Sequence, residues 1–147
     1  MKVRIGPYRK NRATRVEIEP HDTWSMDHTL AMIIHPMLVQ LKATKHGAPN
    51  VDAADVPIEL RATKKQLSAY SKTGETDDNY FKRWDWVLDE MIWAFSHKSK
   101  SMDAGDMCAD KCASFGDPVC KACMKETQTR LNSAFLLFGK YYENLWD

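Results

Sequence analysis

Residues 77–95 read DDNYFKRWDWVLDEMIWAF and predict the helix on which the fold is built. Large apolar side chains recur there at steps of three and four residues, which places them on one face of an α-helix. Asp77 and Asp78 precede that face, where a carboxylate accepts hydrogen bonds from the free N–H groups of a first helical turn. We therefore expect a helix over roughly 78–97. Its apolar face consists of Phe81, Trp84, Leu88, Met91, Ile92 and Phe95.

A second long helix is predicted over roughly 23–46, with Asp22 or Thr23 as its cap. Pro36 lies inside it and removes one backbone donor, so the helix should kink or break near this position. Gly47 follows the last apolar residues and is expected to end the helix. The apolar face of this helix is expected to contain Met26, Leu30, Ile33, Ile34, Met37, Leu38 and Leu41.

The third long helix is predicted to start at Asp117 and Pro118, because aspartate is a favourable cap and proline a favourable first helical residue. Apolar side chains then continue at helical spacing as far as Leu145. Three such helices bury their apolar faces most simply as an antiparallel bundle. The predicted fold class is therefore mainly α: one domain over 1–147, with short helical pieces and five tryptophans in and around the core.

The segments between these helices are shorter and less regular. Residues 2–8 and 14–19 alternate apolar and polar side chains, so a small β-hairpin or an extended arm is expected over 1–20. Residues 48–76 contain several proline, glycine and polar residues and are predicted to form a long, mostly exposed loop. Residues 97–107 show no apolar period and are expected to be a linker.

The composition indicates a globular protein of one domain. The chain has 147 residues, of which 44% are hydrophobic, and its net charge of +1 provides no overall field that favours nucleic acid or membranes. The N-terminal arm is an exception, since its first 15 residues contain six Lys or Arg and no acidic residue. No signal peptide is evident, and no apolar run reaches the ~18 residues of a membrane span. We therefore expect a reducing, cytoplasmic environment, in which structural disulfides are uncommon.

Three stretches carry a resemblance to a known group of proteins: DTWSMDHTLAMIIHPMLVQLKATKHG at 22–47, TDDNYFKRWDWVLDEMIWAF at 76–95 and LFGKYYENLWD at 137–147. Together they resemble small uncharacterised proteins of tailed bacteriophages, notably marine phages that infect cyanobacteria. The resemblance implies expression in the cytoplasm of an infected bacterial host and implies no particular activity. The cysteine segment 105–125 departs from the pattern, so no shared metal role is implied.

Four cysteines lie in the segment 105–125 as two closely spaced pairs. On helices, spacings of four and three residues place each pair on one face, and a turn at 114–117 would bring the two pairs together as a hairpin. Zinc takes four thiolates in such an arrangement, so a structural zinc site is one expected state. Free thiols and two disulfides are the others, and a reducing compartment argues against disulfides. The four residues are Cys108, Cys112, Cys120 and Cys123.

Carboxylates on the predicted helices form a second candidate site. Asp85 and Asp89 share one helix face with Glu90 adjacent, and Asp27 lies in the first predicted helix. Carboxylates that project between helices hold Mg²⁺ or Mn²⁺ together with substrate phosphates in all-α nucleotide hydrolases. The alternative is that these side chains form ion pairs with neighbouring basic groups.

Three functions are consistent with these patterns. The leading hypothesis is a phage accessory protein that binds an unidentified phage or host protein, without catalysis, through the basic arm or the 48–76 loop. The first alternative is a metal-dependent nucleotide or phosphate hydrolase that uses Asp27, Asp85, Asp89 and Glu90, and the second is a virion component. We expect no nucleic-acid partner, since the sequence contains neither a nucleic-acid-binding motif nor a phosphate-binding glycine loop.

Overall fold

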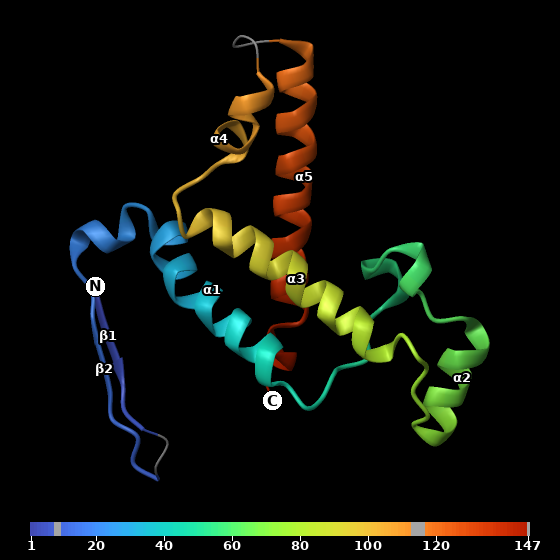
Figure 1. The fold of residues 1–147 in the computed structure, drawn as a ribbon. Coiled ribbons are helices and arrows are strands. Elements are labelled where there is room, and N and C mark those ends of the chain that lie inside the picture. The colour runs from blue at the N-terminus through green and yellow to red at the C-terminus, as the bar shows by residue number, and fades with distance from the viewer. Residues whose placement is uncertain (8–9, 113–116, 147) are drawn as a thin grey trace.

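The computed structural model describes residues 1–7, 10–112 and 117–146 of the chain. This part of the chain is mainly helical and has one two-stranded antiparallel sheet, as Figure 1 shows. The predicted fold class is confirmed at this level. The helices are α1 (Met26–Thr44), α2 (Lys64–Thr73), α3 (Tyr80–Lys98), α4 (Ala104–Cys108) and α5 (Pro118–Lys140), and the strands are β1 (Lys2–Ile5) and β2 (Thr14–Glu17). Five 3₁₀ turns complete the order: η1 (Pro20–Thr23), η2 (Ala53–Asp55), η3 (Ile58–Leu60), η4 (Ala109–Lys111) and η5 (Tyr142–Asn144).

Helix α3 forms the centre of the core, as the apolar period of its sequence predicts. Trp84, Leu88 and Met91 are almost completely buried on it. Helix α1 lies beside α3 and runs in the opposite direction (Figure 1). Its Ala31 and Leu38 belong to the same hydrophobic cluster as the three α3 residues. Each of the large side chains buried here contributes roughly 1.5–3 kcal/mol to the free energy of unfolding. The α1–α3 contact is therefore a major source of stability.

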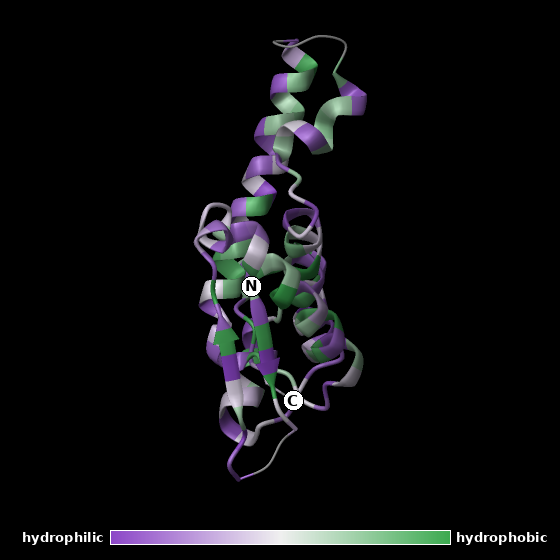
Figure 2. Cartoon of the chain, turned by 90° about the vertical axis from the view of Figure 1, so that its left-hand side faces the viewer, coloured by the Kyte–Doolittle hydropathy of each residue, from purple (hydrophilic) through white to green (hydrophobic). Residues whose placement is uncertain are grey.

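Helix α5 crosses α3 at a steep angle and does not run alongside it (Figure 1). Leu137, near its end, joins the main core, whereas Leu131 and Ala134 form a second, smaller cluster with Ala94 of α3. The N-terminal part of α5 projects beyond the other helices with α4 beside it (Figures 1 and 2). The antiparallel bundle of three long helices is therefore not confirmed, since antiparallel packing is seen between α1 and α3 alone of the three.

The segments predicted to be irregular contain two further helices. The expectation of an exposed loop over 63–76 was wrong, because α2 occupies most of it. Thr63 caps α2 in a reciprocal capping box with Gln66, and Gly74 ends the helix in the left-handed conformation at φ 72°. Helix α4 lies in the predicted linker. Both helices are short, so their caps supply a large share of their stability. The apolar period of the sequence does not indicate this contribution.

Helix α1 also differs from its predicted course. It starts at Met26, because residues 20–23 form the separate turn η1. It runs without a break through Pro36, so of the predicted kink or break the break is not found. An interior proline costs about 3 kcal/mol, and the packing of residues on both sides of it against α3 offsets that cost. The helix ends at Thr44 with an extended Lys45, and Gly47 does not adopt the left-handed conformation expected of a helix-ending glycine.

The tryptophans do not all gather in the core. Trp84 is 1% exposed, as predicted, whereas Trp24 is 86% and Trp146 60% exposed. Phe81, placed on the apolar face of α3 by its spacing, is also half exposed. The helical period identifies a face, but whether a neighbour covers the whole of that face depends on the other elements.

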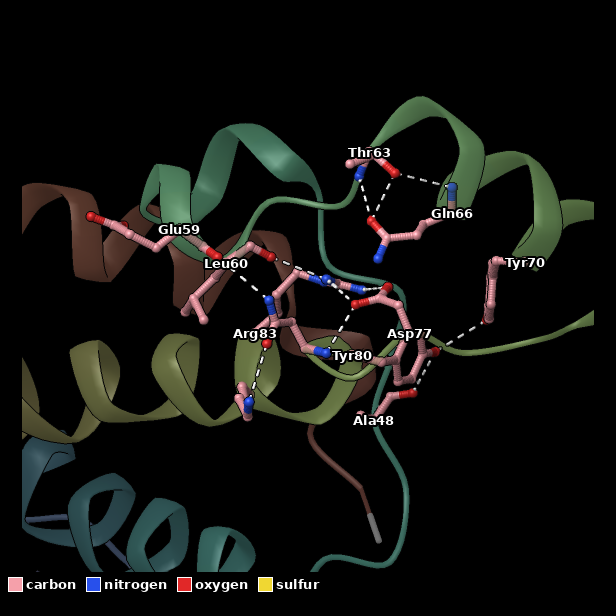
Figure 3. A network of polar contacts seen from close by, with 11 residues as sticks. Ala48, Glu59, Leu60, Thr63, Gln66, Tyr70, Asp77, Tyr80 and Arg83 are labelled. Carbon is pink, nitrogen blue, oxygen red and sulfur yellow. Dashed lines mark hydrogen bonds and ion pairs between the residues drawn. The ribbon is translucent and has the colours of Figure 1, made fainter.

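A polar network attaches the 48–77 region to the start of α3 (Figure 3). The Tyr80 hydroxyl donates to the carbonyl oxygen of Ala48 at 3.0 Å and lies 3.1 Å from the Tyr70 hydroxyl. Burial and the contact with Tyr70 raise the pKa of Tyr80 to about 12. Arg83, which is 2% exposed, pairs with Asp77 in the same network. These contacts add to an apolar interface, since Val51 and Val56 of the same region belong to the main hydrophobic cluster.

Candidate binding surface and cysteine lobe

The four cysteines lie together in what we call the cysteine lobe, residues 104–112 and 117–125. Two disulfides join its two halves, Cys108–Cys123 with 6.1 Å between Cα atoms and Cys112–Cys120 with 4.8 Å. Of the three states considered from the sequence, the structure contains the disulfides. Most of the predicted turn at 114–117 lies outside the described residues. Within the described ranges, no group of three or more His, Cys, Asp or Glu side chains is arranged to hold a metal ion.

Local capping holds the two halves of the cysteine lobe in helical form. The Asp103 carboxylate accepts hydrogen bonds from the N–H groups of Asp106 and Gly105, and these bonds hold the pKa of Asp103 below its usual range. Asp117 caps α5 by accepting from the N–H of Val119 at 3.0 Å, as its sequence predicts. Because both helices begin at side-chain caps, the start of each helix is fixed, and with it the helix face on which its cysteines lie.

The four candidate catalytic carboxylates do not converge on one site. Each forms an ion pair with a basic residue of another helix or helix end, so none points into a shared cavity. Three of the pairs connect α3 with α1 and its C-terminal end, and the fourth connects α3 with α5. The pairs are Asp27–Lys98 at 3.2 Å, Asp85–Lys45 at 2.6 Å, Asp89–Lys42 at 2.5 Å and Glu90–Arg130 at 2.7 Å.

These ion pairs fix the position of α1 along α3. The hydrogen bond from Lys98 lowers the pKa of Asp27, and the bond to Glu90 raises the pKa of Arg130. The Nδ1 atom of His28 lies 2.9 Å from the carbonyl oxygen of Lys98, at the same end of the two helices. Exposed pairs of this kind contribute a few tenths of a kcal/mol to about 1 kcal/mol each, so they set the register more than the stability.

Helix α1 has a second row of apolar side chains that no part of the described chain covers. Its buried row includes Ala31 and Leu38, with the half-buried Ile34 and Leu41 at the same helical spacing. About 100° around the helix, Met26, Leu30 and Met37 form another row at steps of four and seven residues. These three side chains are 56%, 43% and 64% exposed. A helix that is apolar on most of its circumference is normally buried on most of its circumference.

The hairpin presents a second uncovered apolar face. Val3 pairs directly with Val16, and Ile5 and Ile18 lie two residues further along the strands on the same face. All four side chains are about half exposed, and apolar and polar bands alternate along both strands in Figure 2. The opposite face carries Lys2, Arg4 and Arg15. A two-stranded hairpin with neither face packed is marginally stable in water.

We call the apolar face of the hairpin, Trp24 and the second row of α1 the α1–hairpin surface. From the sequence, the α1 residues of this surface were expected to lie in the core, and the hairpin residues on one face of two strands. The signal that identifies the exposed α1 residues is the low amphipathicity of this helix. A strongly amphipathic helix leaves one polar side, whereas α1 has apolar residues on nearly every side. The surface consists of Val3, Ile5, Val16, Ile18, Trp24, Met26, Leu30 and Met37.

A depression of about 480 Å³ lies on another side of the molecule, between α5, Trp86 of α3 and the η2–η3 region. Lys140 at its edge forms ion pairs with Asp52 and, at 2.6 Å, with Asp55. The Tyr141 hydroxyl also donates to Asp55 at 2.6 Å, and burial together with this bond raises the pKa of Tyr141 to about 12. The charged groups of the depression are paired with one another, so it has the character of a structural contact.

No described helix is long and apolar enough to cross a membrane. No model of a known protein family, no curated protein and no solved structure matches this chain.

Proposed function

We propose that this chain is a phage accessory protein, made in the cytoplasm of an infected bacterium, that acts by binding another protein through the α1–hairpin surface. The resemblance of residues 22–47, 76–95 and 137–147 to tailed-phage proteins supports the origin. Trp24 is 86% exposed and lies two residues before Met26, the first residue of the uncovered row of α1, and this exposure is the observation that carries the binding role.

The composition of the surface favours a protein as the bound partner. Tryptophan is among the residues that contribute most binding energy at protein interfaces. Met26 and Met37 have flexible side chains that adapt to an irregular partner. The surface therefore has an anchor residue and adaptable apolar neighbours.

Charge defines the chemistry of the partner more closely. The hairpin carries Lys2, Arg4, Arg12 and Arg15, while Glu17 offers one opposing charge through its ion pair with Arg15. Interfaces place complementary charges around an apolar centre, which raises the rate of association. The basic residues of the strands lie on the opposite face of the hairpin from Val3 and Val16, so they attract an acidic partner at long range and do not contact it across the apolar face. The expected partner is therefore a folded protein with an apolar patch and a net negative charge.

The hydrolase alternative has no specific observation in its favour, because Asp27, Asp85, Asp89 and Glu90 are each paired with a cation, and the described residues contain no group of three or more carboxylates arranged to hold a metal ion. A role as a virion component uses the same surface with a capsid or tail protein as the partner. Mass spectrometry of purified particles separates that case from a protein that acts in the host cytoplasm.

The test maps binding onto the surface with the full-length chain as bait in lysate of infected cells. The triple variant Trp24→Ser/Leu30→Ser/Met37→Gln should lose the partner that the wild-type chain captures. The matched control Ile58→Ser/Leu136→Ser removes two side chains that are 75% and 74% exposed elsewhere, and should retain it. The captured protein is then purified, and its affinity should fall as salt rises.

Three results would overturn the proposal. Equal capture by the triple variant and the wild type would remove the surface from the interaction. Co-sedimentation of the chain with anionic lipid vesicles, lost in the triple variant, would assign the surface to a membrane. A tight dimer in sedimentation velocity, lost in the same variant, would assign it to a second copy of this chain.

A further inference from the structure

We propose that the cysteine lobe binds one Zn²⁺ through Cys108, Cys112, Cys120 and Cys123 when its two disulfides are reduced. The lobe would then be cross-linked in either redox state, by disulfides when oxidised and by zinc when reduced. This inference is independent of the α1–hairpin surface.

The two disulfides join neighbouring positions of the same two segments, Cys108 and Cys112 on one side and Cys120 and Cys123 on the other. Cys120 and Cys123 are three residues apart on α5, so their Cβ atoms are about 5–6 Å apart on one face. The Cys112 sulfur lies 3.1 Å from the carbonyl oxygen of Cys108, which places the second disulfide next to the first. Sulfurs around tetrahedral zinc are about 3.8 Å apart, given Zn–S bonds of about 2.3 Å. Separating each bonded pair by that amount requires side-chain rotation and a small shift of α4.

The surroundings suit a thiolate site. Cys108 is fully buried, and the Thr127 hydroxyl oxygen lies 3.5 Å from its sulfur, where the hydroxyl can donate to a thiolate. Lys111 and Lys121 lie next to ligand positions and are exposed, so they partly offset the negative charge of a tetrathiolate complex.

The cysteine lobe also needs a cross-link. Helix α4 has five residues, and a helix this short does not form alone in water. The apolar cluster nearest to it is small, with Met107 packed at the edge of Ala94, Leu131 and Ala134. Small structural units with little core are commonly stabilised by disulfides or by a metal ion. The same four residues serve either purpose.

The interconversion requires an external dithiol reductant and Zn²⁺ in one direction and a disulfide oxidant in the other. Each disulfide takes two electrons and two protons from a dithiol reductant, which is oxidised to its own disulfide, and yields two thiols. Zn²⁺ then displaces four thiol protons and forms four Zn–S bonds, so the site gains a net charge of −2. Oxidation by a disulfide compound reverses both steps and releases the ion.

The experiment uses the full-length chain, reduced with dithiothreitol and desalted without oxygen. Titration with Zn²⁺ against a chromogenic chelator should give one ion per reduced chain and none per oxidised chain. Co²⁺ in place of Zn²⁺ should give thiolate-to-cobalt charge-transfer bands together with the intense visible bands of tetrahedral cobalt. The variant Cys112→Ser/Cys120→Ser should bind zinc more than ~100-fold more weakly, since two of four ligands are lost.

The matched control is Met124→Leu, which removes a sulfur 3.9 Å from Cys120 that is not a proposed ligand and should leave the affinity unchanged. Absence of stoichiometric zinc in the reduced wild type would overturn the proposal, as would equal affinity in the double cysteine variant. If that variant fails to fold, the cobalt spectrum of the wild type decides, because a spectrum without sulfur charge-transfer bands excludes thiolate ligation.

Discussion

The guanidinium group of Arg83 donates two hydrogen bonds to the carboxylate of Asp77, at 3.0 and 2.6 Å, in a site where Arg83 is 2% exposed. The same guanidinium donates to the carbonyl oxygen of Leu60 at 3.0 Å. Asp77 also accepts from the N–H of Asn79 at 2.9 Å. The Nε atom of Arg83 has no hydrogen-bond partner among the described residues. The ion pair therefore has good hydrogen-bond geometry, but the Nε–H group of Arg83 lacks an acceptor.

Removal of one partner of this buried pair should be more destabilising than removal of both. Asp77→Ala leaves a buried arginine without a counter-charge and should lower the free energy of unfolding by about 3 kcal/mol. The double variant Asp77→Ala/Arg83→Met should recover part of that loss, because methionine fills the volume without a charge. Urea unfolding of the single and double variants measures the coupling. Strictly additive losses would show that the two groups do not stabilise each other.

Acid should destabilise the protein through the same carboxylate. The hydrogen bonds from Arg83 hold the pKa of Asp77 below its usual range, although burial opposes them. A carboxyl with a depressed pKa in the folded state contributes stability that is fully present above its unfolded pKa of about 3.9. That contribution is lost as the pH falls below about 4 and through the folded value. Urea midpoints at pH 7, 4, 3 and 2 should decline more steeply for the wild type than for Asp77→Asn. Parallel declines would assign the acid sensitivity to other groups.

Reduction in the absence of zinc should open the cysteine lobe and leave the main core closed. Each disulfide contributes roughly 2–4 kcal/mol, and the cluster of Ala94, Leu131 and Ala134 is separate from the core of α1 and α3. Hydrogen exchange followed by mass spectrometry should therefore show fast exchange over 104–125 after reduction and chelation. Peptides from α1 and α3 should remain protected. Loss of protection throughout the chain would mean that the disulfides stabilise the whole fold.

Two glycines should respond in opposite directions to substitution by alanine. A Cβ atom at Gly139, inside α5, would have nothing within 4 Å, so Gly139→Ala should stabilise the protein by about 0.5–1 kcal/mol. Gly74 has φ 72°, so Gly74→Ala should destabilise α2 by about 1 kcal/mol. Differential scanning calorimetry measures both changes. A lower melting temperature for Gly139→Ala would indicate a contact at this position that the fold does not account for.

Features set by neighbouring residues could be predicted from the sequence. The helical period and flanking polar residues located α3 to within two residues of Tyr80–Lys98, and Asp117 with Pro118 marked the start of α5. Alternating residues identified the hairpin. The spacing of the cysteines correctly predicted that the two pairs lie together. Helix α2 could not be recognised from apolar content, because its ten residues are mostly polar, although Thr63, Gln66 and Gly74 carry its start and stop signals.

The sequence by itself determined the hairpin, the course of α3, the cap and start of α5 and the meeting of the four cysteines, since each depends on interactions within a few residues or across one turn. Tertiary structure alone decided which row of α1 is buried, because both rows are apolar and only the position of α3 distinguishes them. It also decided that α5 crosses α3 steeply and that Asp85 and Asp89 face Lys45 and Lys42. Those choices depend on contacts between residues far apart in the chain, whose relative positions no local pattern specifies.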